Sequence, residues 1–376
     1  MNTWVVLIVG ATLFVAYANG ANDNFKGVAT LFGSGISTYR KALWWGTITT
    51  LAGSITALFL ATKLISIFQG NGLVPSSLTQ PEPFVAAVIL GAAFTVLLAT
   101  KTGIPISTTH SLTGALFGGG FVAVGINLGF TTLAQNVFLP LLLSPLVAVT
   151  LTLVGYPPWN FGLRLAGFTR ASCVCLGNEI IPATVSSQGT LTAPASASLR
   201  VVVDDRTVCA KPLSGVFFGV SFQSLLDGGH FLSAGAVGFA RGLNDTPKIV
   251  ALGLIVSDLN FNWCVVLIAV AMALGGLLSG RKVGETVGKR ITAMEPDQGF
   301  MANLVTGFLV IVASRWGMPV STTHVSCGSL FGIGLANGQA RWEVIRTILL
   351  AWLLTLPVAG LSAGLIYAIL FRFTET

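Results

Sequence analysis

The chain has 376 residues, of which 53% are hydrophobic and only 9% are charged, whereas an ordinary soluble domain carries roughly 25% charged residues. This composition excludes a soluble globular protein. The net charge of +7 is not concentrated in a basic patch interleaved with aromatic residues, so we expect no nucleic-acid partner.

Several apolar runs approach or exceed the roughly 20 residues that a helix needs to cross a bilayer core. The first run, at 4–18, has no charged leader and no A-x-A-like cleavage site, which predicts a retained helix rather than a signal peptide. Others lie at Ala42–Phe68, Leu133–Gly155, Phe261–Ser279 and Arg346–Leu370. We therefore predict an all-α polytopic protein that crosses the lipid bilayer of a cell (plasma or inner) membrane several times.

Polar residues follow the first apolar run directly, in GANDNFKGVA at 20–29. A charged side chain at mid-membrane costs about 2.5 to 3.5 kcal/mol on insertion scales, so Asp23 and Lys26 must face protein or water. The same element recurs 222 residues downstream as GLNDTPKIVA at 242–251, identical at six of ten positions. We call these two segments the ND motifs, and we predict that each lies at a break in a membrane helix.

A second element is also duplicated. TKTGIPISTTHSLTGALFG at 100–118 recurs as SRWGMPVSTTHVSCGSLFG at 314–332, identical at ten of nineteen positions. The chain is therefore predicted to consist of two homologous transmembrane repeats, 1–155 and 212–376, joined by a polar extramembrane segment at 156–211. The alternation in SLRVVVDDRTVCA within that segment favours a β-hairpin or two.

Loop charge predicts how the two repeats are oriented, because short cytoplasmic loops are enriched in Lys and Arg. In the first repeat the basic loop is YRK at 39–41, and the next connection, at 69–83, has no Lys or Arg. In the second repeat the order is reversed, because SDLN at 257–260 has no basic residue and GRKVGETVGKR at 280–290 has four. Opposite bias in similar halves predicts an inverted-topology repeat with broken helices and re-entrant hairpins, as in secondary transporters.

The ND motifs offer oxygen ligands. Asn22, Asp23, Asn244 and Asp245, together with backbone carbonyls freed at a helix break, could hold a hard cation. A purely structural alternative is that Asp and Lys at positions i and i+3 only neutralise each other on one helix face. That alternative explains one pair, but it does not explain why both halves keep the grouping.

The second duplicated element is suited to bind an anion rather than a cation. Pro105 and Pro319 are expected to end a helix, and the Ser-Thr-Thr triplets that follow are suited to cap a new one. Unpaired N–H groups and three hydroxyls at a helix N-terminus form a site for an oxyanion. The candidate anion ligands are Ser107, Thr108, Thr109, Ser321, Thr322 and Thr323. The GxxxG spacing after each triplet favours close helix packing rather than substrate contact.

Both histidines that follow the triplets, His110 and His324, have two possible roles: hydrogen-bonded core residues or proton carriers. If the four motifs converge near the middle of the membrane, the centre contains donors for an anion and oxygens for cations. The sequence therefore indicates a cation-coupled oxyanion symporter.

The paired G-x-N-D and G-x-P-[IV]-S-T-T-H elements resemble the inorganic phosphate transporter (PiT) family. The resemblance implies a secondary active transporter, commonly a homodimer, that moves phosphate with Na⁺ or H⁺ and uses no cofactor. It implies that Asn22, Asp23, Asn244 and Asp245 hold the coupling cation and that the two Ser-Thr-Thr triplets hold phosphate.

One feature departs from the family pattern, which mostly reads G-A-N-D-V-A-N. This chain has Lys26 and Lys248 where the family has Asn. Each ammonium could neutralise its Asp or contact the anion, so we include both lysines among the candidate substrate ligands. Two Asp and two Lys sum to zero, which would favour two bound cations with a divalent anion. We therefore hypothesise that ion stoichiometry or identity differs from that of the Asn-type members.

Two kinds of enzyme are alternatives to a transporter. The pair of Asp23 and Asp245 invites comparison with intramembrane aspartyl proteases, and Ser107 with His110 suggests a serine hydrolase. Neither enzyme needs the duplicated motifs, so we predict no enzymatic activity. Sulfate or another tetrahedral oxyanion as substrate, and a passive anion channel as mechanism, stay open as alternatives.

Overall fold

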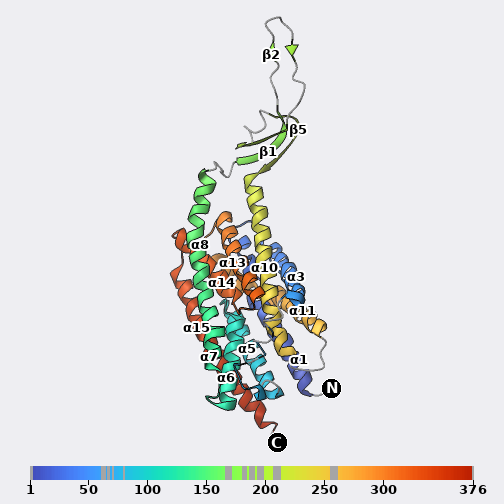
Figure 1. Cartoon of the computed structure of the whole chain (residues 1–376), viewed down its shortest axis with the longest axis vertical. Coiled ribbons are helices and arrows are strands. Elements are labelled where there is room, and N and C mark those ends of the chain that lie inside the picture. The colour runs from blue at the N-terminus through green and yellow to red at the C-terminus, as the bar shows by residue number, and fades with distance from the viewer. Residues whose placement is uncertain are drawn as a thin grey trace. The chain divides into compact units, whose positions relative to one another are not determined.

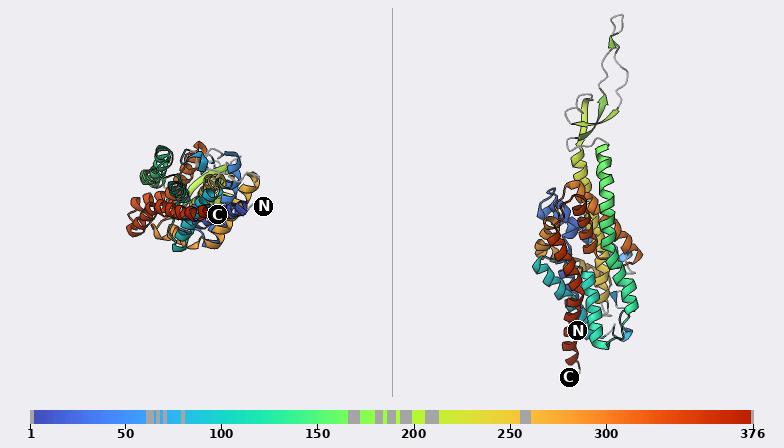
Figure 2. Two further views of the ribbon diagram at one scale, coloured as in Figure 1. Left: turned by 90° about the horizontal axis from the view of Figure 1, so that it is seen from below. Right: turned by 90° about the vertical axis from the view of Figure 1, so that its left-hand side faces the viewer.

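The computed structural model describes residues 3–60, 65, 68–69, 72–78, 81–165, 172–179, 184–185, 191–192, 199–205, 213–254 and 261–374. The chain forms two compact units. One comprises Met1–Tyr156 and His230–Thr376, and the other comprises Pro157–Gly229. The first is helical, and α1 begins and α15 ends at the same end of it (Figures 1 and 2).

The described helices of the first half begin with α1 and end with α8. They are α1 (Thr3–Asp23), η1 (Lys26–Val28), α2 (Ala29–Gly33), α3 (Tyr39–Leu60), η2 (Ser76–Leu78), α5 (Glu82–Thr102), α6 (Thr108–Val124), α7 (Phe130–Thr132), the π-helical η3 (Leu133–Phe138) and α8 (Leu139–Leu165).

Helices of the second half come in a similar order. They are α10 (Phe222–Gly253), α11 (Phe261–Ser279), α12 (Arg281–Glu285), the π-helical η4 (Thr286–Arg290), α13 (Pro296–Trp316), α14 (Thr322–Ala336) and α15 (Trp342–Arg372). The STTH motifs thus begin α6 in one half and α14 in the other. This correspondence supports the predicted repeat, while the opposite insertion of the two copies stays a prediction.

Length and composition agree with a polytopic membrane protein. Within the described residues, seven helical stretches are long and apolar enough to cross a membrane. They are Thr3–Gly33, Tyr39–Phe59, Glu82–Thr102, Phe130–Leu165, Phe261–Ser279, Pro296–Trp316 and Trp342–Arg372. Many large apolar side chains on α8 and α15 are exposed, which suits a surface that faces hydrocarbon rather than water. The chain is a multi-pass membrane protein.

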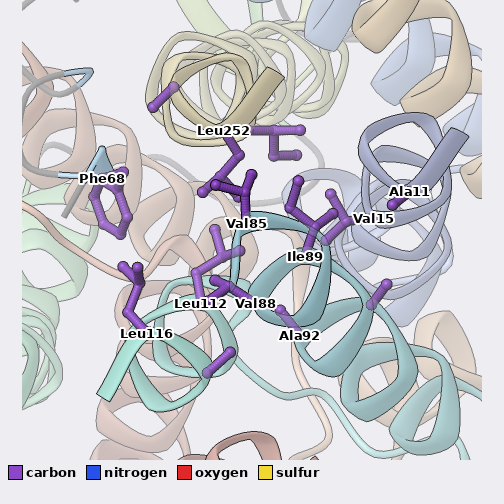
Figure 3. Close-up of a cluster of buried hydrophobic side chains, with 14 of the residues drawn as sticks. Ala11, Val15, Phe68, Val85, Val88, Ile89, Ala92, Leu112, Leu116 and Leu252 are labelled. Carbon is purple, nitrogen blue, oxygen red and sulfur yellow. The ribbon is translucent and has the colours of Figure 1, made fainter. Parts of the chain in front are cut away.

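A large hydrophobic core draws buried side chains from several helices, among them α1, α5, α6 and α10. Val15 of α1, Ile89 of α5, Leu112 of α6 and Leu252 of α10 belong to it, and each is at most 2% exposed. Figure 3 shows these side chains pointing toward one another. This packing fixes α1, α5, α6 and α10 against each other next to the motifs that they carry.

The GxxxG glycines lie at close helix crossings, as predicted. A Cβ atom at Gly118 of α6 would collide with the backbone of Gly360 on α15. A Cβ atom at Gly332 of α14 would meet the carbonyl oxygen of Val149 on α8 at 2.7 Å. Such contact between backbones is possible only without a side chain.

The other unit contains the strands. β1 (Ser172–Glu179) pairs antiparallel with β4 (Leu199–Asp205) and with β5 (Leu213–Ser221), and β2 (Thr184–Val185) pairs with β3 (Leu191–Thr192). β4 lies in the stretch whose alternation predicts a strand. Helix α8 continues past 155 and the sheet extends past 211, so the boundaries proposed from the sequence do not coincide with element ends.

The predicted break at the ND motif is found in the first half only. There α1 ends at Asp23, and a short 3₁₀ turn begins at Lys26. In the second half α10 continues through the motif with Pro247 inside it, so the expectation of a second break is wrong. A proline costs the helix one backbone hydrogen bond, and its fixed φ still suits a helix, so the chain can continue as a kinked helix.

Candidate functional site

The carboxylates of the two ND motifs lie close together although they are 222 residues apart. Asn19 on α1 donates through its side-chain amide to Asp23 Oδ2 at 3.0 Å and to Asp245 Oδ2 at 3.3 Å. Asp23 is 1% exposed and Asp245 is 3% exposed. Two charged groups from different halves are therefore buried at one place.

The Ser-Thr-Thr triplets are positioned by matching hairpins. Helices α5 and α13 end at glycines in the left-handed conformation, Gly103 (φ 78°) and Gly317 (φ 72°), which only glycine adopts without strain. A short extended segment then leads to the next helix. Ser107 and Ser321 cap α6 and α14, because each hydroxyl accepts a hydrogen bond from the backbone N–H three residues later at 3.1 Å. The predicted helix ends and caps are thus confirmed.

The threonine hydroxyls contact the ND motifs of both halves. Thr108 donates to Asp23 Oδ2 at 3.0 Å, and Thr322 donates to Asp245 Oδ2 at 3.5 Å, each within its own half. Thr323 donates to Asp23 Oδ1 at 3.2 Å, across the halves. The two halves therefore share one set of hydrogen bonds.

Both lysines of the ND motifs reach across to the other half. Lys26 Nζ donates to Thr323 Oγ1 at 2.6 Å, and Lys248 Nζ donates to Thr109 Oγ1 at 2.8 Å. Each also forms an ion pair with the aspartate three residues before it: Lys26 with Asp23, and Lys248 with Asp245 at 3.4 Å. The structural reading of these lysines as simple partners of their own aspartates is therefore incomplete.

Asn22 and Asn244 hold the extended segments that precede the triplets. Asn22 accepts from the backbone N–H of Ile106 and donates to the carbonyl of Ile104, both at 3.1 Å. Asn244 donates to the carbonyl of Val320 at 3.2 Å. The amides thus align each ND motif with the hairpin of its own half.

Arg241 is a component that the sequence analysis did not single out. It lies on α10, is 1% exposed, and donates to Asn19 Oδ1 at 2.6 Å and to Asn24 Oδ1 at 3.2 Å. Its Nε lies 3.7 Å from Asp245 Oδ2. The offset of 222 residues between the ND motifs makes Asn19 its counterpart in the first half. Comparison of the two copies could therefore have found this position, where one copy has an arginine and the other an amide.

We use the name buried charge cluster for the five charged side chains brought together here: Asp23, Lys26, Arg241, Asp245 and Lys248. With two carboxylates and three basic side chains, its formal net charge is +1. The sum of zero inferred from the sequence is wrong, because it left out Arg241.

Backbone carbonyls also reach the cluster, but from an unexpected place. The carbonyl oxygen of Ile106 accepts from Lys26 at 2.9 Å, and that of Val320 accepts from Lys248 at 2.8 Å. We expected such carbonyls from breaks at the ND motifs. They come from the extended segments after Pro105 and Pro319, because proline prevents regular helix there and leaves those carbonyls free.

The two histidines lie against each other behind the triplets. Their ring centroids are 4.4 Å apart, and the ring of His324 stacks on Trp352 at 3.8 Å. Both rings line a largely apolar cavity of about 620 Å³ together with Leu141, Pro145 and Trp352. Neither ring makes one of the hydrogen bonds that connect the buried charge cluster to the threonines.

Residues 19–363 match the model of the phosphate transporter family. The chain belongs to that family. It is a transporter and not an enzyme.

Individual relatives agree with this assignment. A protein of Pyrococcus abyssi named a "putative phosphate permease" is 27% identical, with 99% of each chain covered. A protein of Mycobacterium tuberculosis, named a probable low-affinity inorganic phosphate transporter, is 26% identical over 97% of this chain and 77% of its own length. A solved structure called the sodium-dependent phosphate transporter has the same fold, with a TM-score of 0.76, 21% identity, and 99% of this chain and 100% of that chain covered.

Proposed function

We propose that this member of the phosphate transporter family moves inorganic phosphate across the membrane as a symport with a monovalent cation, by alternating access. One observation carries the proposal. Carboxylates, ammonium groups and helix-capping hydroxyls from both halves of the chain meet in one buried cluster. A site that needs both halves is what a transporter built from two repeats requires.

Phosphate would bind where the N-termini of α6 and α14 meet. Each end presents unpaired backbone N–H groups next to the Ser-Thr-Thr triplet, with about half a positive charge from the helix dipole. Lys26 and Lys248 each already contact a threonine of the opposite triplet and would supply charge-assisted donors to phosphate oxygens. The triplets and the two lysines are thus the substrate ligands that we propose.

The coupling cation would lie beside the aspartates. Asn22, Asp23, Asn244 and Asp245 provide the oxygens predicted for this purpose, and all four are buried. The solved relative named above is sodium-dependent by its name, which makes Na⁺ one candidate. H⁺ is the other.

Burial supports alternating access. Thr109, Thr323 and the members of the buried charge cluster are each at most 3% exposed. A hydrated anion can reach them only if the surrounding helices move. The opposite loop-charge bias of the two halves supports a rocking motion of two inverted copies around this fixed site. Assembly as a homodimer stays a prediction.

Uptake of labelled phosphate into proteoliposomes tests the proposal. With an inward gradient of Na⁺ or H⁺, applied separately, the purified protein should accumulate phosphate above its outside concentration. Unlabelled sulfate in excess should compete poorly. Equilibration without accumulation would identify a passive channel, and no uptake under either gradient would contradict the proposed function.

A further inference from the structure

Lys26 occupies a position that otherwise has the composition of a cation site. Four oxygens surround its ammonium: Asn22 Oδ1 at 2.8 Å, the carbonyl of Ile106 at 2.9 Å, Thr323 Oγ1 at 2.6 Å, and Asp23 Oδ1. A carboxylate, an amide, a carbonyl and a hydroxyl are the ligand types that bind a hard cation. An ammonium has three N–H donors, so four acceptors satisfy it completely.

Lys248 has an equivalent shell in the other half. Its ammonium donates to Thr109 Oγ1 and to the carbonyl of Val320, both at 2.8 Å, and lies 3.4 Å from Asp245 Oδ1. Three oxygens face three donors here, one fewer than at Lys26, because the Asn244 amide oxygen accepts from Ser314 instead. In both halves an aspartate, a backbone carbonyl and a threonine of the opposite half surround the lysine, which indicates a specific use of both lysines rather than a chance ion pair.

We propose that Lys26 and Lys248 are built-in cations that fill the two positions where the ND motifs would otherwise hold sodium ions, so that phosphate transport by this chain does not require Na⁺. The oxygens predicted for a coupling ion do not fit Na⁺ here, because fixed ammonium groups already engage them. A sodium ion using Asp23 or Asp245 would also lie next to a positive charge in a water-excluded place, where like charges repel strongly. The proposal rests on the proposed function, which then leaves H⁺ as the coupling cation.

The formal charge of the buried charge cluster is consistent with a proton as the coupling cation. The buried charge cluster has a net charge of +1, so a divalent phosphate ion would leave one negative charge, which a single proton balances. A proton needs no shell of oxygen ligands. Other ionisable side chains that interact with the lysines of the cluster are His110 in the first turn of α6, and His324 and Cys327 in the first two turns of α14.

The effect of Na⁺ on phosphate uptake by the wild-type protein tests whether transport requires Na⁺. Phosphate uptake into proteoliposomes should proceed at the same rate, within about twofold, when external NaCl is replaced by choline chloride, and an inward proton gradient should accelerate it. In parallel, the thermal unfolding midpoint of the purified protein should be the same in NaCl and in choline chloride, because a ligand that does not bind cannot stabilise. Loss of uptake without Na⁺, or a midpoint raised by Na⁺, would overturn the proposal.

The double variant K26N/K248N gives the complementary test. Asparagine removes the ammonium and restores an amide oxygen and free space, so Na⁺ should now bind and raise the unfolding midpoint. Na⁺ should also stimulate its phosphate uptake about tenfold, a typical coupling between two ligands. Lys41→Asn, at an exposed position of α3, should stay insensitive to Na⁺ in both measurements.

Each result separates the inference from the proposed function. A wild-type protein that takes up no phosphate under any gradient would defeat the proposed function, while the unfolding midpoints would still report whether Na⁺ binds. A K26N/K248N protein that folds but shows no Na⁺-dependent midpoint would contradict the assignment of these positions as cation sites.

Discussion

Replacing Asp23 with alanine is expected to abolish phosphate uptake and to destabilise the folded protein by about 3–5 kcal/mol, because it breaks a buried ion pair by removing one partner. The carboxylate accepts from Lys26 and Thr323 at Oδ1, and from Asn19 and Thr108 at Oδ2. Without it, the Lys26 ammonium stays buried with no opposite charge beside it.

Labelled-phosphate uptake and the thermal unfolding midpoint in detergent are the two measurements. Glu285→Ala is the matched control, because it also removes the carboxylate of an ion pair. Glu285 Oε1 lies 3.0 Å from Arg281 Nε, but this pair is on the surface. Exposed pairs of this kind contribute about 0.5 kcal/mol or less. An Asp23→Ala protein as stable and active as Glu285→Ala would show that the buried charge cluster is not needed.

Valine at Gly118 is expected to destabilise the helical unit by about 3 kcal/mol, at the upper end of ordinary overpacking costs. A Cβ there meets the Cα and carbonyl group of Gly360, which are backbone atoms and cannot rotate away. Helices α6 and α15 must separate, and α6 carries Thr108 and Thr109 at its N-terminus. Phosphate uptake should therefore fall together with the unfolding midpoint.

Gly10→Val is the control for this substitution. Gly10 also lies inside a helix, but a Cβ there meets nothing within 4 Å. Its unfolding midpoint should stay near that of the wild type, since substitutions at open surface positions usually change stability by no more than about 0.5 kcal/mol. Equal effects of the two valines would mean that the loss at Gly118 comes from helix propensity and not from helix packing.

Much of the helical architecture could be predicted from the sequence. Apolar runs and low charge predicted the membrane helices, and the proline-then-triplet pattern predicted where α6 and α14 begin. These predictions depend on local properties: hydrophobicity over about 20 residues, and the capping preference of serine. The duplicated ND and STTH motifs also contain most of the side chains that the structure brings together.

Other parts of the site depend on three-dimensional packing that a linear reading does not show. The ND motif predicts a break in each half, but the fixed φ of Pro247 suits a helix, so α10 continues through the second motif. The sequence did not point to Arg241, because the candidate residues were positions that are identical in the two copies, and the copies differ there. Each lysine contacts a threonine of the other half because of the way the two repeats pack. Residue spacing within the sequence does not determine that packing.

Uptake of labelled phosphate by Thr109→Val and Thr323→Val proteins tests the central claim, that the two halves form one transport site, most directly. Each substitution removes a hydroxyl that contacts the lysine of the opposite half, and a hydrogen bond to a charged group is worth about 1.5–3 kcal/mol. Both proteins should therefore lose uptake by about tenfold or more, while Thr347→Val, at an exposed position of α15, should match the wild type. If only one of the two hydroxyls matters and the other can be removed without loss of uptake, the site does not belong to both halves and the account is wrong.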